Sequence, residues 1–329
     1  MFTNICLGDK IGDMIREIDN LAKQTGLKPA QAEGLLNLFC QQIKNQDLLI
    51  ATGLAKSVLD DFRSKISKYL LPSSDKTVFN QEGAKWVQKI NPQPFKWQMS
   101  ISGKMPKALD NIFIQFSKKR DKANRKLDQF RATKETVWRR AALMRDRGDL
   151  DGRRLLFLGD ADWTCLAVAF LKQARRIFVL DIDERVLDDL KEVSQSVGLK
   201  IECLKHDLAN PLPNHLFGNF DVVFSDPPYT DRAVNLFLSR SIEALDKNLA
   251  SRIFFCYGQS DRAREKTLNI QGLLNHSGLL IEECLPKFNR YLGATSIGSS
   301  SALYINSITA KTKPSIVGRF TAPIYTWQK

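Results

Sequence analysis

The pattern of apolar and polar positions changes along the chain near residue 150. Up to about residue 97, apolar residues recur at helical spacing, most regularly in the segment 53–71. Three such helices, followed by a turn, a short strand and a helix start, predict a winged-helix-like domain over residues 1–97. Residues 98–127 are rich in Lys and contain a Gly and a Pro, and we expect them to form a basic linker.

From residue 153 onward, continuous apolar runs alternate with amphipathic segments. The runs RRLLFLGD, RIFVLDID, IECLKHDL, FDVVFSDPPYT and SRIFFCYG have the length and composition of buried strands. Strands that alternate with helices form right-handed crossovers, so the pattern predicts a doubly wound, mostly parallel sheet. We therefore expect an α/β, Rossmann-like domain over residues 128–329. Residues 298–329 alternate weakly and are expected to add edge strands.

Carboxylates follow each of the first four predicted strands, where ligands bind in a doubly wound sheet. A single Asp after a strand is about as often the N-cap of the next helix. Acidic residues at four neighbouring strand ends are harder to explain by capping alone, and they predict a site. The candidate residues are Gly159, Asp160, Asp162, Asp181, Asp183, Asp207, Ser225, Asp226, Pro227 and Tyr229.

The spacing of these acids favours a sulfonium nucleoside as the bound cofactor. An acid at the end of the second strand can accept hydrogen bonds from two ribose hydroxyls, with Asp181 the first candidate and Asp183 the alternative. Asp207 lies where an adenine amino group would arrive. The first strand is not followed by G-x-G-x-x-G, and a pyrophosphate would meet like charge at Asp160 and Asp162. NAD is therefore a poor fit, and S-adenosylmethionine or its decarboxylated form is a better one.

The run Asp226-Pro-Pro-Tyr229 is the most specific short motif in the chain. Proline restricts the backbone, so that Asp226 and Tyr229 project into the site. The run resembles the D-P-P-Y motif of amino-group methyltransferases, which hold an amine nitrogen beside the methyl donor. We take Gly159, Ser225 and Pro227 as cofactor-binding positions beside it.

A longer resemblance covers residues 128–291. The segments DQFRATKETVWRRAALMRDRGDLDGRRLLFLGDADWT, VLDIDERVL, FDVVFSDPPYT and KFNRY resemble the branched-chain polyamine synthase family, the N(4)-bis(aminopropyl)spermidine synthases. The resemblance implies a class I methyltransferase-like fold and aminopropyl transfer from decarboxylated S-adenosylmethionine to the secondary amine of spermidine. In that reaction Asp160 and Asp162 would bind ammonium groups. Asp226 would orient and deprotonate the attacking amine, and Tyr229 would pack on the aminopropyl chain or contact a cation.

The distribution of charge keeps other functions open. The net charge is +13, and residues 1–150 hold 27 basic and 16 acidic side chains. A basic N-terminal part favours a nucleic acid partner and an S-adenosylmethionine-dependent N-methyltransferase acting on an exocyclic amine of RNA or DNA. Tyr229 would then stack on a flipped base, and Asp226 would accept a hydrogen bond from its amine. A third hypothesis is a non-catalytic regulator that senses a ligand.

Composition excludes several other classes. The six cysteines form no C-x-x-C pair and the three histidines are no better placed for zinc, so we expect no metal site. Scattered free thiols are typical of a reducing cytoplasm. No apolar run approaches the roughly 18–20 residues of a membrane span, and no signal-peptide pattern opens the chain. We expect a cytoplasmic protein with no membrane partner and, from the resemblance, a homodimer.

Overall fold

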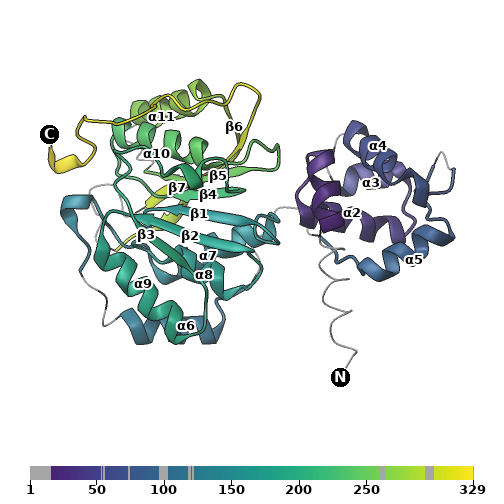
Figure 1. Ribbon diagram of the computed structural model, residues 1–329, viewed down its shortest axis with the longest axis horizontal. Helices are drawn as coiled ribbons and strands as arrows, with labels where there is room; N and C mark the ends of the chain where they lie inside the picture. The colour runs from purple at the N-terminus through teal and green to yellow at the C-terminus, as the bar shows by residue number, and fades with distance from the viewer. Residues whose placement is uncertain are drawn as a thin grey trace. The chain divides into compact units, whose positions relative to one another are not determined.

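The computed structural model describes residues 16–52, 54, 56–72, 75–95, 103–117, 120, 122–258, 264–292 and 300–328. The chain divides into two compact units (Figure 1). The first unit comprises Met1–Ile101 and Asp146–Asp151, and the second comprises Ser102–Arg145 and Gly152–Lys329.

Helices around a small apolar core build the first unit. The described helices are residues 16–25, α2 (Pro29–Cys40), α3 (Asn45–Thr52), α4 (Lys56–Lys65), the 3-10 turn η1 (Ser67–Tyr69) and α5 (Gln81–Ile90). Leu35, Phe39 and Phe62 are among the side chains buried in its core. Within the described part of this unit, β pairing is limited to isolated antiparallel bridges, Lys44 with Lys76 and Leu70 with Phe79. The winged-helix character of this unit therefore stays a prediction.

The segment expected to be a basic linker differs from that expectation in the structure. Residues 98–102, 118, 119 and 121 lie outside the described residues, but Lys107–Ser117 form helix α6, which belongs to the second unit. Its Leu109, Phe113 and Phe116 are buried. Their spacing of four and three residues makes one apolar helix face within a stretch that composition alone marks as polar.

A second difference in the boundaries concerns residues 146–151, which group with the first unit. Lys28, at the start of α2, lies with its Nζ 2.7 Å from a carboxylate oxygen of Asp149. The same ammonium donates to the carbonyl of Arg147 at 2.7 Å, and both Lys28 and Asp149 are buried. A buried ion pair thus ties this short stretch to α2.

The second unit is built on a seven-stranded sheet in the order β3-β2-β1-β4-β5-β7-β6 (Figure 1). Its strands are β1 (Arg154–Leu158), β2 (Arg176–Asp181), β3 (Glu202–Lys205), β4 (Val222–Ser225), β5 (Arg252–Tyr257), β6 (Leu279–Arg290) and β7 (Ser300–Ile308). Strands β1 to β5 pair in parallel, and β7 runs antiparallel to both of its neighbours. The mostly parallel sheet is as predicted.

One expectation about the sheet needs correction. Residues 298–329 were expected to add edge strands, but β7 lies inside the sheet between β5 and β6. Its residues are buried almost throughout, on both faces of the sheet. The edge strand on this side of the sheet is β6, and β3 forms the other edge.

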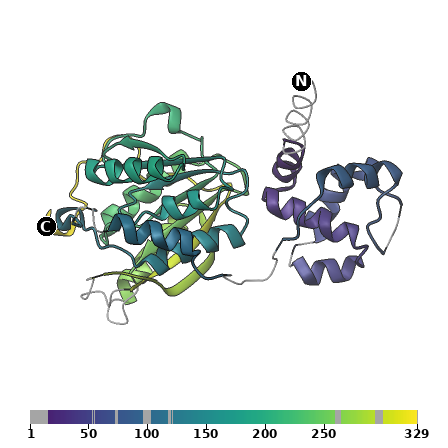
Figure 2. The same ribbon diagram turned by 90° about the horizontal axis from the view of Figure 1, so that it is seen from below.

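Helices cover both faces of this sheet. Helices α8 (Thr164–Phe170) and α9 (Glu184–Ser196) pack on β2 and β3, and Figure 2 views the molecule from the side on which they lie in Figure 1. Helices α10 (Asp231–Ala244) and α11 (Arg264–His276) cover the opposite face (Figure 1). Helix α7 (Lys134–Asp146) precedes β1, and the short 3-10 turns η2 (Arg125–Leu127), η3 (Asn214–Leu216) and η5 (Thr326–Gln328) complete the unit. Because β1 to β4 are parallel, their carboxyl ends share one edge of the sheet.

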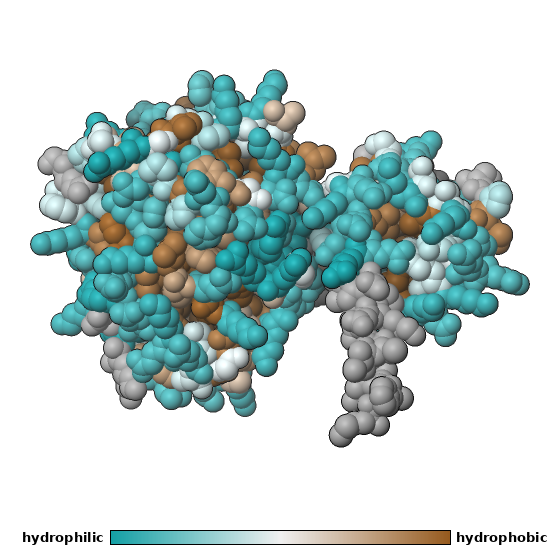
Figure 3. Space-filling view, viewed as in Figure 1, coloured by the Kyte–Doolittle hydropathy of each residue, from teal (hydrophilic) through white to brown (hydrophobic). Residues whose placement is uncertain are grey.

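Both units present a largely hydrophilic surface on the face drawn in Figure 3, where apolar residues form separate patches. No helix within the described ranges is both long enough and apolar enough to cross a membrane.

Candidate active site

A cavity of about 260 Å³ opens at the carboxyl ends of β1 to β4. Its wall contains most of the predicted site residues: Gly159, Asp160, Asp162, Asp181, Asp207, Asp226, Pro227 and Tyr229. Two predicted residues, Asp183 and Ser225, are absent from the wall as far as the described residues define it. With Asp128 the wall carries six aspartates, and the described residues that line it include no Lys or Arg. Such a wall attracts cations.

The turn after β1 places the Asp160 carboxylate beside the first backbone N–H groups of α8. Gly159 has a φ of 71°, in the left-handed region that favours glycine. This turn directs the Asp160 carboxylate to the helix, where it accepts hydrogen bonds from the backbone N–H groups of Thr164 at 2.9 Å and Cys165 at 2.7 Å. Burial raises the pKa of Asp160 to about 7, although these hydrogen bonds oppose the shift. Asp160 therefore caps a helix as well as lining the cavity.

Asp181 and Asp183, the two candidates after β2, have different surroundings. Asp181 accepts hydrogen bonds from the backbone N–H groups of Asp160 at 3.1 Å and Asp183 at 2.9 Å, and it lines the cavity. Burial raises the pKa of Asp181 to about 6. Asp183 is the N-cap of α9 and forms an ion pair with Arg185 at 2.7 Å. The geometry therefore favours Asp181 over Asp183 as the acceptor for a ligand in the cavity.

The ends of β3 and β4 also contribute to this edge. Asp207 lines the cavity and accepts a hydrogen bond from the backbone N–H of Ala209 at 2.9 Å. Ser225, the last residue of β4, is fully buried, and its hydroxyl has no hydrogen-bond partner among the described residues. Ser225 thus directly precedes Asp226 in the chain but does not line the cavity.

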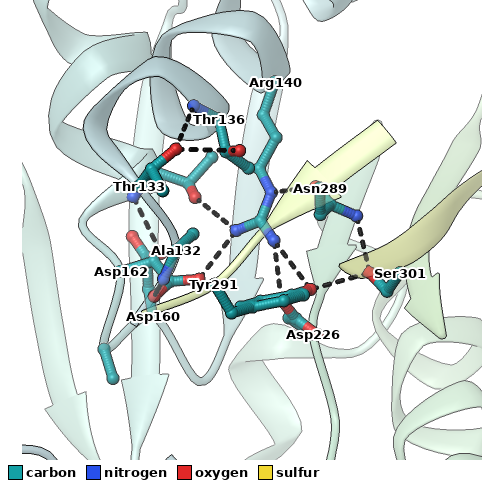
Figure 4. Close-up of polar contacts among 12 residues, drawn as sticks. Ala132, Thr133, Thr136, Arg140, Asp160, Asp162, Asp226, Asn289, Tyr291 and Ser301 are labelled. Atoms are coloured by element: carbon teal, nitrogen blue, oxygen red, sulfur yellow. Dashed lines mark hydrogen bonds and ion pairs between the residues drawn. The ribbon is translucent and has the colours of Figure 1, made fainter. Parts of the chain in front are cut away.

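Arg140, on α7, joins two of the predicted carboxylates and was missed by sequence reasoning. Its side chain has 0% exposure. The guanidinium donates to Asp162 Oδ2 at 2.8 Å, to Asp226 Oδ2 at 2.6 Å and to Asn289 Oδ1 at 2.8 Å (Figure 4). Asp162 Oδ1 accepts the backbone N–H of Ala132 at 2.7 Å, so the protein itself engages both oxygens of Asp162.

A signal for Arg140 was present in the sequence. It comes three residues after Val137 and four before Met144, and all three side chains are buried. An arginine on the apolar face of a helix indicates a buried carboxylate partner, because an unpaired buried charge is too costly. Which carboxylates it would meet could not be inferred, since Asp226 lies 86 residues away.

Tyr291 is the second residue that sequence reasoning did not assign. Its hydroxyl donates to Asp226 Oδ2 at 2.6 Å and lies 2.8 Å from Ser301 Oγ (Figure 4). Tyr229 lies farther away, with its hydroxyl 3.3 Å from Asp226 Oδ1 and 3.1 Å from the Tyr291 hydroxyl. Burial raises the pKa of Asp226, while Arg140 and Tyr291 oppose that shift. The signal for Tyr291 was its place at the end of the motif KFNRY.

The C-terminal segment, for which the sequence indicated no function, forms part of the wall. Ile324, Tyr325 and Thr326 line the cavity. Thr326 donates its backbone N–H to Asp128 Oδ2 at 2.7 Å, and its hydroxyl also bonds this carboxylate. Burial raises the pKa of the Tyr325 hydroxyl. Residues nearly 200 positions apart thus meet beside the cavity.

Sequence comparisons relate the chain to known proteins. Residues 108–322 match the sequence profile of the branched-chain polyamine synthase A C-terminal domain. The chain is 42% identical over 211 residues to the uncharacterized protein MJ0675 of Methanocaldococcus jannaschii, an alignment that covers 64% of this chain and 52% of that protein. It is 35% identical over 182 residues to the N(4)-bis(aminopropyl)spermidine synthase of the same organism, covering 55% of this chain and 52% of that one. The chain therefore spans about half the length of these curated relatives.

A solved structure resembles the whole chain. It is the branched-chain polyamine synthase from Thermus thermophilus in complex with N4-aminopropylspermidine and 5'-methylthioadenosine. The TM-score is 0.61 at 20% identity, and the match covers 96% of this chain and 98% of that one. At this identity the likeness bears on the fold, and it confirms the class I methyltransferase-like fold predicted from the sequence.

Proposed function

The chain belongs to the family of the branched-chain polyamine synthase A C-terminal domain, and on that premise we propose that it is an aminopropyltransferase. It moves an aminopropyl group from decarboxylated S-adenosylmethionine to an amine of a spermidine-like polyamine. The observation that carries this proposal is the cavity wall with six aspartates, five of which follow strands. Both substrates are cations, and a wall of carboxylates favours them.

The residues present fit the nucleoside part of the donor. Asp181 would accept the ribose hydroxyls and Asp207 the adenine amino group, while Leu208 and Phe237 provide apolar walls for the ring. Gly159 allows the chain to turn close beside the ligand. The donor supplies a methylene carbon activated by its bond to a positively charged sulfur.

The residues around Asp226 fit the acceptor. A secondary amine is mostly protonated near neutral pH, and it must lose a proton before it can attack. Asp226 would take that proton, and the ring of Tyr229 would contact the aminopropyl chain. Asp160 and Asp162 would bind ammonium groups of the substrates, since each of their oxygens accepts one hydrogen bond from the protein and keeps a second acceptor site.

Charge favours a polyamine over a nucleic acid as the partner. The first unit holds 14 basic and 13 acidic side chains, against 35 and 23 in the second unit. The unit expected to grip a phosphate backbone is therefore almost neutral. A polyanion would also meet the six aspartates of the cavity wall. The carboxylates of this wall therefore do not favour methyl transfer to RNA or DNA.

We propose a class of acceptors, the linear polyamines, and not one compound, because the relatives of this chain differ in what their names say. One archaeon, Methanocaldococcus jannaschii, holds both a protein named N(4)-bis(aminopropyl)spermidine synthase and an uncharacterized relative. This chain is 42% identical to the second and 35% to the first. A panel of linear polyamines, with spermidine among them, is therefore the appropriate set of acceptors.

The test is a transfer assay with the full chain. We expect decarboxylated S-adenosylmethionine and one of the polyamines to give 5'-methylthioadenosine and an aminopropylated product, detected by mass spectrometry. Asp226→Asn should lower the rate by roughly 10²–10⁴-fold, the usual contribution of a general base. Asp188→Asn is the matched control, because Asp188 is exposed on α9 and pairs with Lys191 on the surface.

Two results would contradict the proposal. Methyl transfer from S-adenosylmethionine to RNA or DNA, with no polyamine product, would establish the N-methyltransferase hypothesis instead. Tight binding of the nucleoside without turnover on any acceptor would indicate a ligand-sensing regulator.

A further inference from the structure

The two oxygens of Asp226 have unequal surroundings. Oδ2 receives hydrogen bonds at 2.6 Å from both Arg140 and Tyr291. Oδ1 is 3.3 Å from the hydroxyl of Tyr229. A carboxylate that is held so tightly on one oxygen has its other oxygen fixed in direction.

We propose that Tyr291 and Arg140 are positioning residues for aminopropyl transfer, which bind Asp226 Oδ2 and so make Oδ1 the atom that receives the amine proton. This inference rests on the proposed function. It also assigns different roles to two tyrosines that contact the same carboxylate.

Tyr291 and Tyr229 differ in the acceptors of their hydroxyl protons. The Tyr291 proton lies on the 2.6 Å contact to Asp226 Oδ2, and the Tyr291 oxygen accepts a hydrogen bond from Arg140 at 3.3 Å. Tyr229 can donate its single proton either to Asp226 Oδ1 at 3.3 Å or to the Tyr291 oxygen at 3.1 Å. When an ammonium group approaches Oδ1, the Tyr229 hydroxyl can turn to Tyr291 and release Oδ1.

Arg140 is itself fixed from several sides, so it can serve as a rigid support. Its Nε donates to Asn289 Oδ1 at 2.8 Å, and Asn289 Nδ2 donates to Ser301 Oγ at 2.8 Å. Ser301 lies 2.8 Å from the Tyr291 hydroxyl, which closes a ring of contacts (Figure 4). A network with every member bonded holds its geometry better than a single pair does.

The charged and titratable groups that face Asp226 come from five places. They are Arg140 from α7, Asp162 from the segment after β1, Tyr229 from the segment after β4, Cys256 from β5 and Tyr291 directly after β6. Asp162 disfavours the charged form of Asp226, and Arg140 and Tyr291 favour it. Loss of the Tyr291 hydrogen bond should therefore make Asp226 easier to protonate.

The step balances as follows. The acceptor ammonium gives a proton to Asp226 Oδ1 and becomes a neutral secondary amine. Its lone pair forms a bond to the donor methylene as the carbon–sulfur bond breaks. The electron pair of that bond stays on sulfur, which leaves as a neutral thioether. The product is a tertiary ammonium that keeps its remaining proton, and Asp226 is left protonated.

The experiment is a pH profile of kcat for the wild type, Tyr291→Phe, Tyr229→Phe and Tyr257→Phe. Tyr291→Phe should shift the acidic limb upward by about one to two pH units, since a hydrogen bond to a charged group contributes about 1.5–3 kcal/mol. Tyr229→Phe should change KM and leave the limb within a few tenths of a unit. Tyr257 is buried against the ring of Tyr229 outside the cavity wall, so Tyr257→Phe serves as the control.

A second variant tests the guanidinium. In Arg140→Lys, one ammonium cannot reach Asp162, Asp226 and Asn289 at once, because lysine is a single point of charge. We expect kcat to fall at least tenfold while donor affinity changes less than threefold. An unchanged limb in Tyr291→Phe together with an unchanged kcat in Arg140→Lys would overturn the inference.

A measurement without turnover separates this inference from the proposed function. In protein labelled with ¹³C at aspartate carboxyls, the Asp226 signal is identified by its loss in Asp226→Asn. Its titration should move to higher pH in Tyr291→Phe, and an identical titration in both proteins would contradict the Tyr291 contact. If no acceptor is aminopropylated, the proposed function and the catalytic role fail together, while this titration still decides whether Tyr291 holds the carboxylate.

Discussion

Burial disfavours the charged form of Asp160 and of Asp181. Burial raises the pKa of Asp160 to about 7 and that of Asp181 to about 6. An unfolded aspartate titrates near 3.9, so the folded protein binds more protons between about pH 4 and 7. Their contribution to stability is therefore present at low pH and is lost as the pH rises through the folded pKa values.

This shift leads to a prediction for Asp160→Asn. As the pH rises from about 5 to about 8, the wild type should lose stability relative to the variant, because only the wild type must ionise a buried carboxyl. Urea unfolding midpoints at several pH values would measure the difference. A cationic nucleoside in the cavity should reduce the trend, and a difference that is constant with pH would contradict it.

Single residues also mark how far sequence reasoning could go in the site. The carboxylates could be found because each follows its own strand in the local sequence. Their partners could not, since Arg140 and Tyr291 reach Asp226 across 86 and 65 positions. Asp183 was ambiguous for a physical reason, because an acid at that position can serve a ligand or cap the next helix, and here it caps α9.

Among the elements, two turns beside strands contain a glycine with a positive φ, and the atoms around the two glycines differ. Gly159, after β1, and Gly278, between α11 and β6, both have φ near 70°, at 71° and 70°. An added Cβ at Gly159 would meet Phe237 at 3.9 Å, which is an ordinary contact. At Gly278 it would lie 2.4 Å from the backbone oxygen of Lys311, where no flexible side chain can move aside.

Alanine substitutions at these two glycines should therefore distinguish backbone strain from a steric clash. Gly159→Ala should cost about 1–2 kcal/mol of unfolding free energy, the price of a left-handed conformation at a non-glycine residue. Gly278→Ala should cost clearly more, because the backbone must also shift. Chemical denaturation of both variants measures this, and equal losses would show that the turn before β6 can relax.

The elements that sequence patterns predicted are those with regular periods. The parallel strands β1, β2, β4 and β5 are nearly continuous apolar runs, as a sheet covered on both faces requires. Strand β6 was missed because its alternation is broken. Its pairing with β7 shifts register between Ile281 and Glu283 and again between Leu285 and Asn289. The first shift adds one residue and moves later side chains to the other face, and the second adds two residues and interrupts the alternation again.

At the scale of the whole molecule, the division into two units depends on one buried pair within the first unit. Lys28 and Asp149 are both buried, and their atoms meet at 2.7 Å. This pair explains why residues 146–151 belong with the first unit although the chain has already begun the second. Composition could not reveal it, since both residues look like ordinary surface charges in the sequence.

Breaking the pair should destabilise the first unit. Lys28→Met leaves the Asp149 carboxylate buried without its ammonium, and such a loss costs roughly 3–5 kcal/mol. The double variant Lys28→Met/Asp149→Leu should recover much of that loss, because neither charge is then left unpaired. A double-mutant cycle in urea, followed by fluorescence, measures the coupling, and additive effects would show that the two residues do not interact.

The same pair has a consequence for how the protein is made. Lys28 leaves the ribosome 121 residues before Asp149. At synthesis rates of about 5–20 residues per second, its partner follows after roughly 6–24 s. During that interval the N-terminal helices hold a lysine that must stay in water, so the first unit cannot reach its final packing in the order of its own synthesis. The first part of the chain to be translated is thus completed only after helices α6 and α7 of the other unit have been made.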